Sequence, residues 1–117
     1  MRWTWNNGAS LHLAEILGHE YLDETYAVID TALGFFRNIK AENQKRSIKI
    51  SEWKAFANIL YAAHLAACDR DKVEPEVSLE DCFTHVNREP AIIVEVLTEA
   101  IKTITIKQKG EAGEENA

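Results

Sequence analysis

One alanine-rich segment in the middle of the chain organises the fold: residues 51–67, which read SEWKAFANILYAAHLAA. Trp53, Phe56 and Leu60 recur at the three- and four-residue spacing of one helix face. The other side of this helix is mostly alanine, and side chains that small let a second helix approach closely. We therefore expect a long central helix, ending near Asp69, with neighbours on more than one side.

The same spacing recurs before and after this segment. Between residues 22 and 39, two apolar stripes lie side by side, and Phe35 and Phe36 fall one in each. An apolar face this wide is expected to contact more than one neighbour. Residues 91–104 repeat the pattern with isoleucine, leucine and alanine, and a shorter apolar run covers residues 11–17.

Polar residues and glycine predict where these helices begin and end. Gly18 is placed to end the first helix, and Pro90 suits the first position of the last one. The break before Pro90 is expected at residues 87–89. The predicted N-caps are three serines: Ser10, Ser51 and Ser78.

Three short stretches alternate polar and apolar residues, which is the period of a strand. They are residues 2–5, 47–50 and 102–107. We expect a strand and turn at the first, an edge strand at the second, and an extended end after about residue 104. Trp3 and Trp5 would then share one strand face, and we expect both to cover the helical core because large aromatic side chains are mostly buried.

These patterns predict a mainly α fold, a small helical domain of four or five helices with room for a minor two- or three-strand element. A chain of 117 residues is long enough for one domain. We expect the domain to span residues 1–107. Residues 108–117 are acidic and contain glycine, and we expect them to form a disordered tail.

The formal net charge is −6, which argues against nucleic acid as the main partner because phosphate binding needs a basic face. The charges are unevenly spread, with an acidic window at residues 69–81 and a basic window at residues 37–54. The basic window holds Arg37, Lys40, Lys45, Arg46, Lys49 and Lys54. These two windows could be solvated loops, or they could steer a protein partner or a second copy of the chain.

No apolar run is long enough for a membrane span, and the first eight residues contain no signal-peptide core. We therefore expect a cytoplasmic protein.

The residues with metal-ligand chemistry form two pairs. His64 and Cys68 are four residues apart, and Cys82 and His85 are three apart, so each pair shares a helix face. Facing each other, they would make a tetrahedral set suited to zinc. The alternative is two buried thiols and two ordinary histidines. The acids of 69–76 lack the glycine and final glutamate of a calcium loop.

No motif of a catalytic nucleophile and base is present, and no glycine-rich phosphate loop. We expect no enzymatic activity and no cofactor. The wide apolar faces and the basic window instead favour protein binding and self-association. The predicted interface residues are Phe35, Phe36, Arg37, Lys45, Arg46 and Ile59.

Three features resemble the tail assembly chaperones of long-tailed bacteriophages and prophages. The segment 51–67 is similar to an aromatic, alanine-rich helix of that family with a Leu-Tyr-Ala core. Residues 77–81 (VSLED) are similar to its (S/T)-L-E-(D/E) step into a short helix. The third feature is a final apolar helix, 91–106, followed by a charged tail. The resemblance covers roughly residues 51–110, while residues 1–8 differ from the family's strand-turn-strand opening.

The resemblance implies a non-catalytic protein that binds the long, aggregation-prone tape measure protein and helps recruit tail tube subunits. It would be absent from the finished tail. The alternatives from other classes are a small zinc-binding regulatory protein and a structural subunit of an oligomer.

Overall fold

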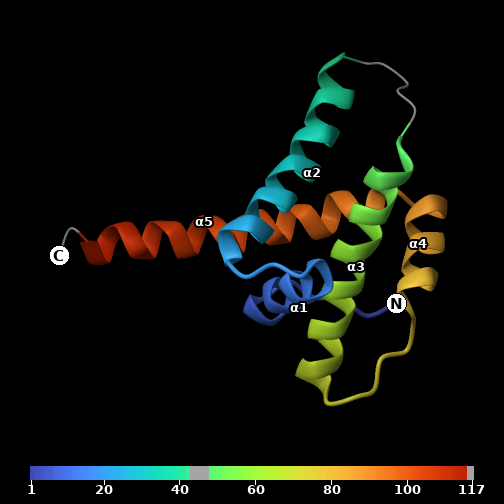
Figure 1. Cartoon of the computed structure of the whole chain (residues 1–117), viewed down its shortest axis with the longest axis horizontal. Coiled ribbons are helices and arrows are strands. Elements are labelled where there is room, and N and C mark those ends of the chain that lie inside the picture. The colour runs from blue at the N-terminus through green and yellow to red at the C-terminus, as the bar shows by residue number, and fades with distance from the viewer. Residues whose placement is uncertain (43–47, 116–117) are drawn as a thin grey trace.

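Five helices make up the part of the chain that the structure describes. The structure, a computed structural model, describes the backbone of residues 1–42 and 48–115 and the side chains of residues 1–37 and 48–104. The helices are α1 (Asn7–Leu17), α2 (Leu22–Glu42), α3 (Ile50–Asp71), α4 (Leu79–Arg88) and α5 (Ala91–Glu115). The predicted mainly α fold is therefore confirmed (Figure 1).

Helix α3 is the centre of the molecule, as predicted. It contacts all four other helices. Its fully buried residues include Phe56, Leu60 and a series of alanines, so its neighbours approach closely. Trp53 is half-buried and packs against this core, as do Leu33 and Phe36 of α2. Ile93 and Leu97 bring α5 into the same core.

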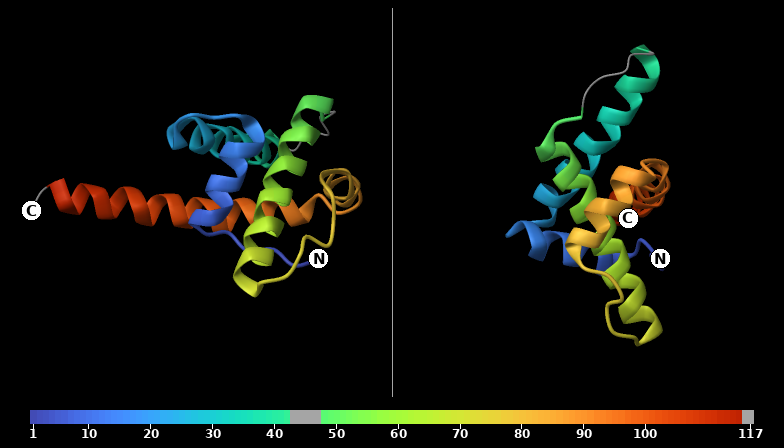
Figure 2. Two further views of the ribbon diagram at one scale, coloured as in Figure 1. Left: turned by 60° about the horizontal axis from the view of Figure 1, so that its bottom comes forward. Right: turned by 90° about the vertical axis from the view of Figure 1, so that its right-hand side faces the viewer.

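Figures 1 and 2 show how the other helices surround α3. Helix α2 leads away from α1, and α4 runs beside α3. Helix α5 crosses α2 and α3, and its C-terminal part extends away from the other helices. None of these helices, over the residues that the structure describes, combines the length and the apolar character that a membrane span needs.

The expected strand element is wrong for the described residues, none of which forms a β-strand. Residues 2–5 are an extended N-terminal arm that lies on α3, where the Thr4 amide donates to the Ala63 carbonyl at 3.1 Å. Their alternation reflects contact with helices on one side. Trp5 is buried, as predicted, and Trp3 is half-buried against the core. In the expected edge strand at residues 47–50, residues 48–49 are irregular and Ile50 begins α3, while residues 43–47 lie outside the described part of the chain.

Two of the three predicted N-caps are wrong. The N-cap of α1 is Asn6, whose side chain accepts from the Ala9 amide at 3.1 Å, and Ser10 is buried inside the helix. Helix α3 begins before Ser51, because the Glu52 carboxylate accepts from the amide of the N-cap residue Lys49 at 3.0 Å. A bond of this kind satisfies a backbone amide at the first turn of a helix.

The remaining helix ends follow the sequence more closely. Ser78 caps α4, with Asp81 completing a reciprocal pair of hydrogen bonds. Gly18 ends α1 with a φ of 69°, a left-handed conformation that glycine adopts without strain. The expected end of the last helix near residue 104 is wrong, since α5 continues to Glu115. Ile104 is buried one helical turn after Ala100, so core contact outweighs the strand preference of β-branched residues.

The domain boundary at residue 107 and the disorder of residues 108–117 stay predictions. The side chains of 105–117 lie outside the described part of the chain.

The core position of Leu60 gives the first prediction. Leu60→Ala is expected to lower the free energy of unfolding by about 2–5 kcal/mol, because the fully buried side chain leaves a cavity. Denaturant unfolding measures the loss. Leu11, which is 55% exposed, provides the control substitution Leu11→Ala. A loss below about 1 kcal/mol for Leu60→Ala would contradict the core placement.

Candidate functional site

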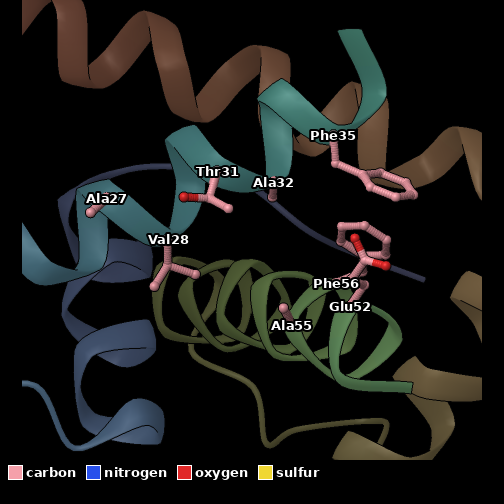
Figure 3. A pocket seen from close by; sticks show the side chains of 8 residues that line it. All are labelled: Ala27, Val28, Thr31, Ala32, Phe35, Glu52, Ala55 and Phe56. Carbon is pink, nitrogen blue, oxygen red and sulfur yellow. The ribbon is translucent and has the colours of Figure 1, made fainter. Parts of the chain in front are cut away.

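An apolar hollow on the surface lies between α2 and α3. It has a volume of about 260 Å³. Its walls are almost entirely apolar, and Thr31 and Glu52 contribute the polar groups (Figure 3). The lining residues are Ala27, Val28, Thr31, Ala32, Phe35, Glu52, Ala55 and Phe56. We call this the α2–α3 hollow.

Small residues on both helices create this space. Ala27 and Ala32 on α2 face Ala55 on α3, so the two helices leave a gap that longer side chains would fill. Ala27 and Thr31 are exposed and form the rim. The two phenylalanines close one end of the hollow, and Val28 lies toward the other (Figure 3).

A cluster of four aromatic rings surrounds the closed end. Phe35 and Phe56 have ring centroids 5.5 Å apart, and Phe36 lies 5.1 Å from Phe56. Trp53 completes the cluster, with its ring nearly perpendicular to that of Phe56 and the two ring centroids 6.1 Å apart. Aromatic pairs prefer edge-to-face and tilted arrangements of this kind. The end wall of the hollow is therefore aromatic and apolar.

The lining of the hollow offers mainly apolar contact. Thr31 and Glu52 are its polar residues, and the Glu52 carboxylate accepts from the Lys49 amide. A surface of this kind is suited to apolar side chains of a partner.

The predicted interface residues do not all share one surface. Phe35 lines the hollow, Phe36 is half-buried next to it, and Arg37 is exposed. Ile59 is fully buried in the core, so it cannot contact a partner in this fold. The side chains of Lys45 and Arg46 lie outside the described part of the chain. Sequence reasoning missed Thr31 and Ala55, since small residues between large ones carry no distinct signal.

The four residues weighed as candidate zinc ligands are not brought together. Within the part of the chain that the structure describes, no three histidine, cysteine or acidic side chains are placed to hold a metal ion. His64 and Cys68 do meet, with 3.4 Å between Nε2 and Sγ. His85 is partly exposed and points toward Glu89, at 3.7 Å.

His64 has a structural role instead. Its ring is fully buried, and the Glu76 amide donates to Nε2 at 3.1 Å. An amide can only donate, so Nε2 carries no proton and Nδ1 does. Nδ1 accordingly donates to the Arg2 carbonyl at 2.8 Å. The imidazole thus joins the N-terminal arm to the segment before α4, and neither nitrogen is left for a metal.

The cysteines are buried and reduced, as expected for small apolar side chains. Burial, with a smaller contribution from the negative charge of Asp81, raises the pKa of Cys82 to about 12. A thiol at that pKa stays protonated at neutral pH, whereas both nucleophilic attack and zinc binding need the thiolate. Cys82 is therefore a packing residue.

The acidic window is largely used within the chain. Asp69 pairs with His12 at 2.6 Å, and Asp71 with both Arg2 and Arg70 at 2.9 Å. Glu76 forms a second ion pair with Arg2. The two pairs of Arg2 tie the arm to the end of α3 and to the segment that follows it, and the pair of His12 ties α1 to the same end of α3. The partners are roughly sixty to seventy residues apart, a separation at which no sequence pattern indicates a partner.

The second prediction concerns His64. His64→Leu is expected to cost about 1–3 kcal/mol of unfolding free energy, because the Arg2 carbonyl and the Glu76 amide lose their partner. Hydrogen exchange at the Glu76 amide should accelerate. His85→Leu is the matched control, expected to change stability by less than about 0.5 kcal/mol. Unchanged stability together with unchanged exchange at Glu76 would refute the role of His64.

The third prediction follows from Asp71. Hydrogen bonds from Arg70 and, to a smaller extent, Arg2 hold the pKa of its carboxyl below its ordinary value of 3.8. A lowered folded-state pKa stabilises the fold above the ordinary pKa, and this contribution disappears as the pH falls through the folded value. Asp71→Asn should therefore unfold more easily than the parent at pH 6, with a difference that vanishes in acid and shrinks in high salt. An equal difference at every pH would contradict this.

Comparison with known proteins identifies no protein related to this chain. The chain matches no protein-family model, and neither the curated proteins nor the solved structures contain a significant match to it.

Proposed function

We propose that this protein is a non-catalytic chaperone of phage tail assembly that acts in the cytoplasm of the host cell. Its client would be the tape measure protein, a long chain that aggregates when its apolar segments are exposed. The chaperone would keep that chain dispersed and help recruit tail tube subunits, and it would need no cofactor.

The observation that carries this proposal is the α2–α3 hollow. It is mainly apolar, about 260 Å³ in volume and closed at one end by the rings of Phe35 and Phe56. A hollow of this kind accepts one or two apolar side chains of a client helix, recognised by their spacing along its face. The basic residue Arg37 is exposed next to Phe36 and suits a client whose apolar residues are flanked by acids.

Two further lines support the proposal. The segments 51–67 and 77–81 resemble the helix and the capping step of tail assembly chaperones. The titratable residues described above serve as helix caps and arm contacts, a use that fits a binding protein.

The fourth prediction tests this function with two threonine variants. Co-expression with the tape measure protein encoded in the same gene cluster should keep that protein in the soluble fraction. Thr31→Arg places a long cation at the exposed rim of the hollow and should return the tape measure protein to the pellet. Thr84→Arg, on the exposed face of α4, is the control and should preserve solubility.

Two results would overturn the proposal. One is a tape measure protein that is equally soluble with Thr31→Arg and with the parent chain. The other is a gene neighbourhood with neither a tail tube gene nor a tape measure gene.

A further inference from the structure

A second apolar hollow lies between α3 and α4 and has a volume of about 560 Å³. On the α4 side, its apolar surface comes from Leu79, which is 40% exposed, and from the half-buried ring of Phe83. On the α3 side, the small side chain of Ala57 leaves room between the two helices. We call it the α3–α4 hollow; its lining residues are Lys54, Ala57, Asn58, Leu79, Glu80 and Phe83.

The two hollows lie on opposite sides of α3. Successive residues of an α-helix are about 100° apart around its axis, so Glu52 and Phe56 face away from Lys54 and Asn58. Figure 1 shows the same arrangement, with α2 on one side of α3 and α4 on the other. A molecule bound in one hollow therefore leaves the other open.

The walls of the α3–α4 hollow carry opposite charges that no described residue neutralises. Lys54 on α3 and Glu80 on α4 are both exposed, and neither forms an ion pair within the part of the chain that the structure describes. Asn58 lies one turn after Lys54 on the same side of α3, and its side-chain amide has no hydrogen-bond partner among the described residues. An apolar centre with a polar rim is the usual arrangement of a protein interface.

The apolar surface continues along the groove between the two helices. Ile50 is 69% exposed and lies on the same side of α3 as Lys54, one turn before it. Because α4 runs antiparallel to α3 (Figure 1), Ile50 lies toward the end of α4, while Leu79 is at its start. The ten residues of α4 make this groove about 15 Å long, which corresponds to about three turns of a partner helix.

The helices of the chain itself do not offer a matching surface. A helix that fills such a groove presents several apolar side chains one or two turns apart on one side. Outside the groove, the described helices each expose at most one large apolar side chain, Leu11 on α1 and Val94 on α5. The described residues of a second copy therefore provide no apolar stripe for this hollow, which favours a helix of a different protein.

We propose that the α3–α4 hollow binds an amphipathic helix of another protein, whose apolar stripe has acidic residues along one flank and basic residues along the other. The stripe packs on Leu79 and Phe83. The acidic flank faces α3, where it pairs with Lys54 and accepts from the Asn58 amide, and the basic flank faces α4 and pairs with Glu80. Charged pairs at the edges of an apolar seam are typical of helices that pack side by side.

The opposite charges of the two walls also fix the direction of the bound helix. Turning the partner end for end would exchange its two flanks and place like charges against Lys54 and Glu80. Such contacts between like charges oppose binding, so one direction is favoured.

The fifth prediction uses three synthetic helical peptides of about 20 residues, long enough to form a helix in water. All carry the same leucine stripe; the flanks are glutamate and lysine in the first, glutamate on both sides in the second, and lysine on both sides in the third. Anisotropy of a fluorescent label measures binding in physiological salt. The mixed peptide should bind most tightly, and the others about tenfold more weakly, because each places like charges against Glu80 or Lys54.

Charge reversal in the hollow should change the order of the peptides. Glu80→Lys should bind the acidic peptide best, and Lys54→Glu the basic peptide best. Glu15→Lys and Lys72→Glu change the net charge by the same amounts at exposed positions that do not line the hollow, and they should keep the order of the parent. Thermal unfolding checks that each variant is folded.

This contact is independent of the α2–α3 hollow, so Thr31→Arg should leave binding of the mixed peptide unchanged even where it abolishes binding of the tape measure protein. Equal affinity for the three peptides, no binding at high micromolar concentration, or an order that stays the same in Glu80→Lys and Lys54→Glu would overturn the proposal. So would sedimentation showing that the mixed peptide binds only by dissociating larger species of the parent chain, since the occupant would then be a second copy.

Discussion

A single buried imidazole joins parts of this chain that are far apart in sequence. His64 projects from the central helix and bonds the Arg2 carbonyl with one nitrogen and the Glu76 amide with the other. The first contact positions the N-terminal arm, and through it Trp5 in the core and Trp3 beside α5. The second fixes the segment that leads into α4. Besides this residue, the arm is held by the hydrogen bond from the Thr4 amide to the Ala63 carbonyl, by the burial of Trp5, and by exposed ion pairs, which contribute little in water.

The hollow between α2 and α3 is the surface on which the proposed function depends. It is lined mainly by alanines and phenylalanines, and its single carboxylate accepts from the amide at the start of α3. Apolar packing would govern the contact with the proposed client.

Local features of this fold could be predicted from the sequence, whereas long-range ones could not. The period of Trp53, Phe56 and Leu60 predicted α3, and Ser78 and Gly18 marked a start and an end, because these signals act within one or two turns. Asn6 was missed in favour of Ser10, since two good caps lay close together. The bonds of His64 join residues 12 and 62 positions away, and the α2–α3 hollow depends on where small residues from two helices meet. Such features arise only once the helices are packed.

The position of the arm has a consequence for synthesis on the ribosome. Residues 2–5 are made well before their partners at Ala63, His64, Asp71 and Glu76. Until residue 76 has left the exit tunnel, Trp3 and Trp5 of the nascent chain lack their final packing. The arm therefore cannot complete its native contacts until α3 and the segment that follows it have been made. A chain proposed to protect others from aggregation is thus itself exposed early in its own synthesis.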